Sequence, residues 1–164
     1  MRFQRNILVA FATFLAVLLV APLASARGLS PAASGLLRAV NATRSAHHLR
    51  PLRVDATLTR AAQSHSRDMV AHGYFAHGAF RSRMLTFHAR GPFVGENLAW
   101  GVGSMASPGA IVNEWLASPE HRANLLNRGW REVGLSAIHV ASAHGAYHDL
   151  DVTIVTADFG ARHK

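Results

Sequence analysis

Residues 115–126 have the sequence WLASPEHRANLL, in which one helix ends and another begins. Ser118 is suited to cap a helix, Pro119 fits the first helical position, and Glu120 places an acid in the first turn. His121 therefore lies in the first turn of a helix, where the backbone dipole disfavours an imidazolium and lowers its pKa. Neutral imidazole is the form that binds metal ions, so this position in a helix would suit metal binding by His121.

Helical periodicity extends in the N-terminal direction from this stretch. Ser30-Pro31 is expected to open a first helix that ends before Pro51, and a second helix is expected over about residues 56–72 with Gly73 as its stop. A third helix is expected to begin at Ser107-Pro108 and to lead into residues 115–126. The segment 73–103 is rich in Gly, His and aromatic residues, and we expect it to be irregular apart from a short strand near residues 96–100.

The C-terminal part changes from helical to strand periodicity. Residues 133–140 and 151–159 are expected to be strands, joined by a turn over residues 143–149. Helices first and a hairpin last indicate an α+β fold, in which helices pack on a small, mostly antiparallel sheet.

Residues 1–26 have the layout of a secretory signal peptide. Arg2 and Arg5 precede an apolar run over residues 7–23, and Ala24-Ser25-Ala26 supplies the small residues of a cleavage site. The alternative is an uncleaved anchor, but the run is at the short limit for a membrane span. We expect cleavage after Ala26, a single domain over residues 27–164 with its core at about 36–160, no stable membrane span, and a secreted or periplasmic protein.

Composition excludes several classes of function. The 164 residues include 17 Lys and Arg, 9 Asp and Glu, and no cysteine, so disulfides, thiolate catalysis and cysteine zinc sites are excluded. The arginines are scattered, without a block or interleaved aromatic residues, and we expect no nucleic-acid partner. A mild attraction to anionic envelope surfaces is the simpler consequence of the net charge of +8.

Some motifs lack the context that their chemistry requires. Residues 101–106 match a G-x-G-x-x-A dinucleotide pattern, but no long strand precedes them and export argues against such a cofactor. His144 and His148 are four residues apart, yet Gly145 between them predicts a solvated turn. His65 falls on the apolar side of the second helix, which predicts a core histidine.

Three short stretches remain as candidates for a site: residues 73–77 (GYFAH), 95–100 (GENLAW) and 115–126. If two imidazoles and a carboxylate from them converge, they suit a divalent metal with room for water or substrate, or a proton shuttle. A buried polar network without chemistry is the alternative. Gly95 is expected to permit a tight turn that Asn97 pins, and Trp100 and Trp115 are expected in the core.

The order of these motifs resembles a known family. The matching elements are Phe75-x-His77, Gly95-Glu96-Asn97, Trp115 followed by Ser118-Pro119-x-His121-Arg122-x-Asn124, and a terminal Asp158-Phe159-Gly160. Together they resemble a bacterial CAP domain, also called SCP/PR-1-like, over about residues 36–160. Each motif is weak alone, but their number and order are specific.

The resemblance implies an α-β-α sandwich with a surface cleft. Carried over residue by residue, it implies His77, Glu96 and His121 as cleft residues, with His77 and His121 able to hold zinc or another divalent metal. In eukaryotic members a second Glu follows the helix Trp by three residues, and the matching position here is Ser118. The sequence therefore supports a His-Glu-His triad rather than a full tetrad.

Three functions follow as hypotheses. The first is a secreted protein whose cleft binds a small-molecule, lipid, peptide or cell-wall ligand, directly or through a divalent metal. The second is a metal-assisted hydrolase of peptide or cell-wall material, with Glu96 as its catalytic general base. The third is a structural envelope module without catalysis.

Overall fold

The computed structural model describes residues 29–89 and 94–161, and the expected signal peptide lies outside them. The helices are α1 (Pro31–Ala46), α2 (Ala56–His72), α3 (Phe80–Thr86), α4 (Pro108–Ala117) and α5 (Pro119–Leu125), with short 3-10 turns at η1 (Gly103–Ala106) and η2 (Gly145–Tyr147). The strands are β1 (Arg53–Val54), β2 (Val94–Gly101), β3 (Glu132–Ala143) and β4 (Leu150–Gly160).

The four strands form one mixed sheet in the order β1-β3-β4-β2. The long β3–β4 hairpin is antiparallel, β2 adds antiparallel to β4, and β1 adds parallel to β3. The predicted small, mostly antiparallel sheet is therefore confirmed. Strand β2 is an edge strand, so groups from both faces of the sheet can approach it from the side.

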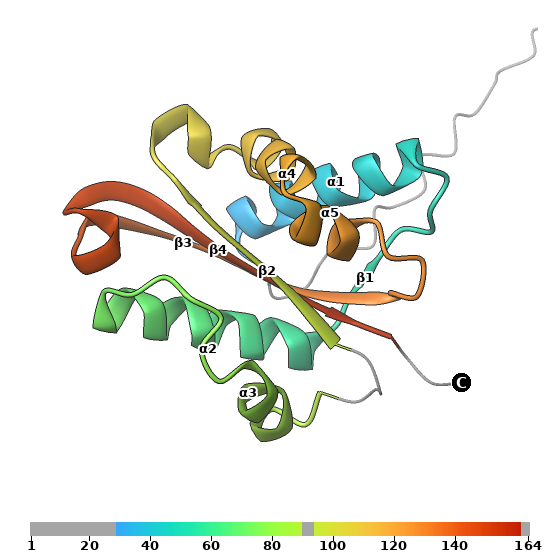
Figure 1. The fold of residues 1–164 in the computed structure, drawn as a ribbon, viewed down its shortest axis with the longest axis horizontal. Coiled ribbons are helices and arrows are strands. Elements are labelled where there is room, and N and C mark those ends of the chain that lie inside the picture. The colour runs from blue at the N-terminus through green and yellow to red at the C-terminus, as the bar shows by residue number, and fades with distance from the viewer. Residues whose placement is uncertain (1–28, 90–93, 162–164) are drawn as a thin grey trace, which may run out of the picture.

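The sheet lies between two helical layers (Figure 1). Helices α1, α4 and α5 cover one face and α2 with α3 covers the other, which confirms the α-β-α sandwich. The first layer packs on a core that includes Leu36, Trp115 and Val155, whereas Met69 of α2 packs on Leu98 and Ile154. The alternation of side chains along each strand divides the core into these two parts.

Most helix boundaries follow the local capping signals. Ser30, Asp55 and Ser107 accept hydrogen bonds from backbone N–H groups in the first turns of α1, α2 and α4. Gly73 ends α2 in the left-handed conformation, with φ of 65°. These capping residues account for the agreement between the predicted and observed ends of α2.

The expectation of an irregular segment over residues 73–103 is wrong in two places. Helix α3 forms within it, although Ala79 provides no side-chain cap, and β2 is longer than the short strand expected. The glycine-rich residues 101–106 form the end of β2 and the turn η1 rather than a nucleotide-binding loop.

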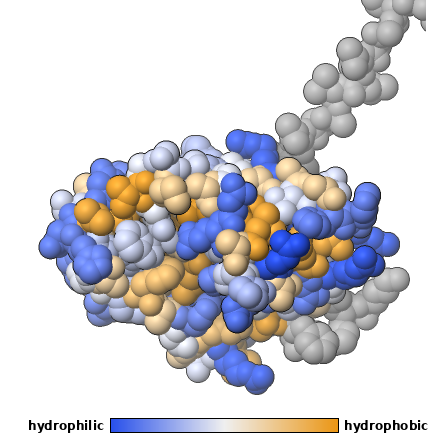
Figure 2. All heavy atoms as spheres, turned by 45° about the horizontal axis from the view of Figure 1, so that its top comes forward, coloured by the Kyte–Doolittle hydropathy of each residue, from blue (hydrophilic) through white to orange (hydrophobic). Residues whose placement is uncertain are grey.

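No helix in the described part of the chain has the length and hydropathy needed to span a bilayer. The outer surface of the α1, α4 and α5 layer, in view in Figure 2, intersperses hydrophilic and hydrophobic residues.

Candidate functional site

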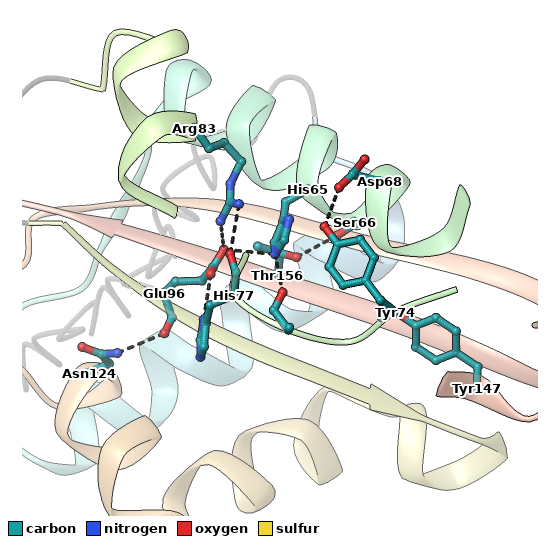
Figure 3. A network of polar contacts seen from close by, with 11 residues as sticks. His65, Ser66, Asp68, Tyr74, His77, Arg83, Glu96, Asn124, Tyr147 and Thr156 are labelled. Carbon is teal, nitrogen blue, oxygen red and sulfur yellow. Dashed lines mark hydrogen bonds and ion pairs between the residues drawn. The ribbon is translucent and has the colours of Figure 1, made fainter. Parts of the chain in front are cut away.

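Glu96 lies at the centre of the candidate site, on the edge strand β2. The alternation of β2 directs Glu96 toward the α2 face and Asn97 toward the α5 face, as Leu98 and Ala99 in the two core clusters also show. The Glu96 side chain is only 2% exposed. Both of its carboxylate oxygens are bound by cationic or imidazole groups (Figure 3).

His77 reaches Glu96 from the segment between α2 and α3. Its Nδ1 lies 2.8 Å from Oε1 of Glu96, and its side chain is 55% exposed. A carboxylate only accepts hydrogen bonds, so Nδ1 donates and neutral His77 keeps its lone pair on Nε2. A carboxylate that fixes the tautomer in this way is the arrangement found behind metal-binding histidines.

Arg83 of α3 binds the other carboxylate oxygen of Glu96 through Nη2 and donates from Nη1 to the carbonyl of His77 at 3.3 Å. Its side chain is 10% exposed, so the ion pair is largely shielded from water. The carboxylate is thus held between the guanidinium of Arg83 on one side and the half-exposed imidazole of His77 on the other (Figure 3).

His65 of α2 forms the buried side of this network. Its Nε2 lies 3.0 Å from the carbonyl of Ala76 and 3.9 Å from Oε2 of Glu96. Because the carbonyl can only accept, Nε2 carries the proton. Burial lowers the pKa of His65, more than the neighbouring Glu96 charge raises it, and the ring is therefore neutral. The predicted core histidine is confirmed as buried.

Asp158 of β4 stands opposite Glu96 in the register of the β2–β4 pair. It is fully buried, and neither of its carboxyl oxygens has a hydrogen-bond partner among the described residues. Burial, followed by the negative charge of Glu96, raises the pKa of Asp158 well above its usual range. Burial beside Glu96 therefore favours the protonated form of Asp158, while Arg83 pairs with the Glu96 carboxylate.

The segment that carries His77 is held by α2 and by the β3–β4 turn. Tyr74 Oη donates to the carboxylate of Asp68, and the Tyr74 carbonyl accepts from Tyr147 Oη at 2.8 Å. The carbonyl of Gly73 accepts from the backbone of Ala146 at 2.8 Å. Burial, with the bond to Asp68, raises the pKa of Tyr74 to about 12, so the phenol remains a donor at neutral pH.

Helix α5 brings His121 to the same edge of the sheet from the other layer. Asn97 Nδ2 donates to the carbonyl of His121 at 2.9 Å, and Asn124 Nδ2 donates to the carbonyl of Glu96 at 3.0 Å. These reciprocal bonds fix the first turn of α5 against β2. Burial, then the proximity of His77, lowers the pKa of His121.

Gly95 and Asn97 differ in one respect from their predicted roles. Both lie within β2 rather than in a turn. A Cβ atom at Gly95 would lie 2.9 Å from both Asn124 Oδ1 and Trp130 Cζ2, so glycine is needed for the close approach of α5. Asn97 joins the strand to α5 and does not pin a turn. The expectation that Trp115 lies in the core is confirmed, and its Nε1 donates to the carbonyl of Leu98.

Two of the imidazoles predicted for the site, those of His77 and His121, are near enough for His77 to contribute to lowering the pKa of His121. No group of three His, Asp or Glu side chains within residues 29–89 and 94–161 is placed to hold a metal ion. Glu96 is committed to His77 and Arg83, which fits a supporting role behind a ligand. Ser118, at the position of the second Glu, supplies no carboxylate.

Sequence reasoning missed the residues that surround Glu96. Arg83 lies on α3, and no capping residue before α3 predicts that a helix begins there. Asp158 was noted only as part of a terminal motif, although an acid within the apolar strand 152–159 is itself a signal of a buried polar site. His144 and His148 lie at the solvated turn η2, as predicted.

A hollow of about 240 Å³ lies beside this network, between α2 and α3. Its polar lining includes His65, Arg83, Asp68 and Tyr74. Arg83 and His65, which lie against Glu96, therefore also border space that water or a polar group can enter.

Comparison with known proteins gives one family. The cysteine-rich secretory protein family model, CAP, matches residues 37–159. Uncharacterized protein YkwD of Bacillus subtilis is 33% identical over 107 residues, which cover 62% of this chain and 40% of YkwD. Uncharacterized membrane protein YlbC of the same organism is 31% identical over 105 residues, which cover 61% of this chain and 30% of YlbC. The chain thus spans less than half the length of these two curated relatives.

Solved structures show the same fold. An extracellular protein containing an SCP domain from Bacillus anthracis aligns with a TM-score of 0.63 at 27% identity, over 79% of this chain and 40% of that protein. An outer surface protein from Borrelia burgdorferi aligns with a TM-score of 0.66 at 22% identity, over 78% of this chain and 90% of that one. The second likeness concerns the fold alone.

Proposed function

The chain belongs to the cysteine-rich secretory protein (CAP) family, and we propose that it is an exported CAP-domain protein whose His77–His121 pair binds a ligand, directly or through a divalent metal ion. The observation that carries this proposal is the His77–Glu96 contact, in which a buried carboxylate orients an exposed imidazole. Export is supported by the signal-like residues 1–26 and by an SCP-domain relative described as extracellular.

A divalent ion such as zinc would be held by Nε2 of His77 and by the imidazole of His121. Such an ion would supply Lewis acidity to a coordinated oxygen or nitrogen of the ligand. The protein's own contribution is to lower the pKa of His121, chiefly by burial, and to fix the His77 tautomer. Two protein ligands leave the remaining positions to water or to the ligand, so we expect weak, exchangeable binding rather than a closed structural site.

Glu96 is proposed as a positioning residue rather than as the general base of a hydrolase. A general base must reach the proton that it removes, and both Glu96 oxygens are already engaged beneath His77. The hydrolase hypothesis therefore needs a base other than Glu96. The burial of Glu96 instead favours the structural module as the second candidate, because a satisfied buried network also stabilises a fold.

Zinc titration by calorimetry tests the proposed site. We expect saturable binding by the purified protein and a loss of at least tenfold in affinity in the double variant His77→Ala/His121→Ala. The matched control is His144→Ala/His148→Ala, which removes two exposed histidines from the η2 turn and should leave the affinity unchanged.

Thermal unfolding of the same variants separates the two candidates. Because His77 is half-exposed, its removal should change stability little if the site serves binding. Unchanged zinc affinity in the His77/His121 variant, with a large drop in its melting temperature, would support the structural module and contradict the binding site.

A further inference from the structure

Two segments that are distant in the sequence form one end of the molecule. Residues 44–53 follow α1, and residues 125–132 follow α5. The backbone N–H of Arg53 donates to the carbonyl of Arg131 at 3.0 Å, and Arg53 pairs with Glu132 in the β1–β3 register. Figure 1 shows the two connections side by side, at the end of the sheet where β1 lies.

Arg44 joins these segments from within. Its Nε donates to the carbonyl of Arg50 at 3.0 Å, and its Nη1 donates to the carbonyls of Leu125 at 2.8 Å and Asn127 at 3.1 Å. Arg44 is fully buried, and no carboxylate among the described residues forms an ion pair with it. The fold therefore places a fixed, un-neutralised positive charge beneath this end.

The surface above Arg44 is strongly basic. The two segments contain five arginines and one carboxylate, that of Glu132. Arg50, Arg53, Arg128 and Arg131 are exposed, as are His47 and His48. Arg131 is near enough to Arg44 for its charge to contribute to lowering the pKa of Arg44, after burial. Figure 2 shows many hydrophilic residues, interspersed with hydrophobic ones, at this end of the molecule.

We propose that this arginine surface, formed by Arg50, Arg53, Arg128 and Arg131 over buried Arg44, binds a linear polymer of phosphate groups. Guanidinium groups bind phosphate oxygens in pairs, and four of them spread over two connections suit an extended chain rather than one compact anion. The arginines that are scattered in the sequence are brought together here by the fold. This inference does not depend on the His77–His121 site.

The same surface fits a membrane or a nucleic acid less well. The large hydrophobic residues that are exposed in the described part of the chain lie outside these two segments, so this surface offers no large, exposed apolar side chain to insert into a bilayer. Trp130, the one Trp, Tyr or Phe residue of the two segments, is 5% exposed and cannot stack on bases. The arginine surface therefore recognises the negative charges of phosphate groups along a chain.

Fluorescence anisotropy with labelled linear polyphosphate tests the proposal. We expect the quadruple variant R50Q/R53Q/R128Q/R131Q to lose at least tenfold in affinity, and the slope of log affinity against log salt to fall in magnitude by about 0.7 for each lost phosphate contact. The matched control is R38Q/R60Q/R67Q/R81Q, which has the same net charge and removes four exposed arginines elsewhere. It should retain most of the affinity.

A second variant distinguishes the loss of phosphate contacts from a loss of folding. Arg131 also donates to the carbonyls of Arg128 and Trp130, whereas the double variant R50Q/R128Q leaves these bonds in place. It should show an intermediate loss of affinity with an unchanged melting curve. Equal losses in the quadruple variant and its charge-matched control would overturn the proposal, as would the absence of polyphosphate binding by the natural chain. Arginine-dependent binding to phosphatidylglycerol vesicles without polyphosphate binding would overturn it in favour of a membrane.

Discussion

At the residue scale, the site is organised by one buried charge. Glu96 balances Arg83 and sets the tautomer of His77, and its charge adds to burial in raising the pKa of Asp158. A single carboxylate at this position thus links the orientation of an exposed imidazole to the stability of the buried network. The consequence is that changes at Glu96 should affect binding and folding together, whereas changes at His77 should affect binding alone.

Glu96→Gln should therefore lower both stability and zinc affinity. It leaves the Arg83 guanidinium without its counter-ion, which costs about 3 kcal/mol when a buried pair is broken. The neutral amide also supports the His77 imidazole less strongly, and we expect zinc affinity to fall roughly tenfold or more. Urea unfolding and calorimetry measure the two effects. Asp149→Asn, at an exposed position after the η2 turn, is the control and should change neither.

Asp158→Asn should change how stability depends on pH. The folded-state pKa of Asp158 is raised above its ordinary value of 3.8, so its contribution to stability is present below that value and is lost as the pH rises through the folded pKa. The amide cannot ionise in either state. The variant should therefore gain stability relative to the natural chain from acidic to neutral pH. Urea unfolding across that range measures it, and parallel curves for the two proteins would contradict the raised pKa.

At the scale of single elements, strand β2 holds α5 through a close contact at Gly95. A Cβ atom there meets Asn124 and Trp130 at 2.9 Å, which is inside ordinary contact distance. Gly95→Ala should destabilise the protein by about 1–3 kcal/mol because such overpacking displaces α5. It should also weaken zinc binding, because α5 carries His121.

Gly109→Ala is the matched glycine control. A Cβ atom at Gly109 meets nothing within 4 Å, and the residue lies in α4. Alanine should be neutral or stabilise the protein by about 0.4–1 kcal/mol because it restricts the unfolded chain. Thermal unfolding compares the two variants. An equal effect at both positions would show that the Gly95 contact does not position α5.

The elements that the sequence predicts well are those with local signals. Asp55 and Gly73 define α2, Ser118-Pro119 separates α5 from α4, and the change to alternating apolar residues predicts the β3–β4 hairpin. Helix α3 has seven residues and no side-chain cap, so little in its sequence distinguishes it from a loop. Since α3 carries Arg83, the ion pair with Glu96 was missed together with its helix.

At the scale of the whole molecule, the site exists because β2 is at the edge of the sheet. His77 precedes α3 and His121 lies in α5, and Figure 1 shows these two helices in opposite layers on either side of the sheet. The two imidazoles are near enough for His77 to contribute to lowering the pKa of His121. The spacing of His77 and His121 along the sequence does not predict that they lie near each other, because their proximity depends on the strand order β1-β3-β4-β2. Before the structure, only the family resemblance grouped His77, Glu96 and His121, and the burial of Glu96 could not be read from any of the three motifs.

Acid should destabilise the whole molecule through two histidines, the buried His65 and the partly buried His121. The pKa values of His65 and His121 are both lowered from 6.5 in the folded state, chiefly by burial. Below 6.5 the unfolded chain therefore binds protons that the folded chain does not, and stability falls as the pH drops from neutral toward the lowered values. His65→Gln keeps a donor for the Ala76 carbonyl without a titrating ring, so its stability should fall less steeply over this range. His47→Gln, at an exposed position, is the control. Urea midpoints at a series of pH values measure the slopes, and an unchanged slope in His65→Gln would show that His65 is not a source of the acid sensitivity.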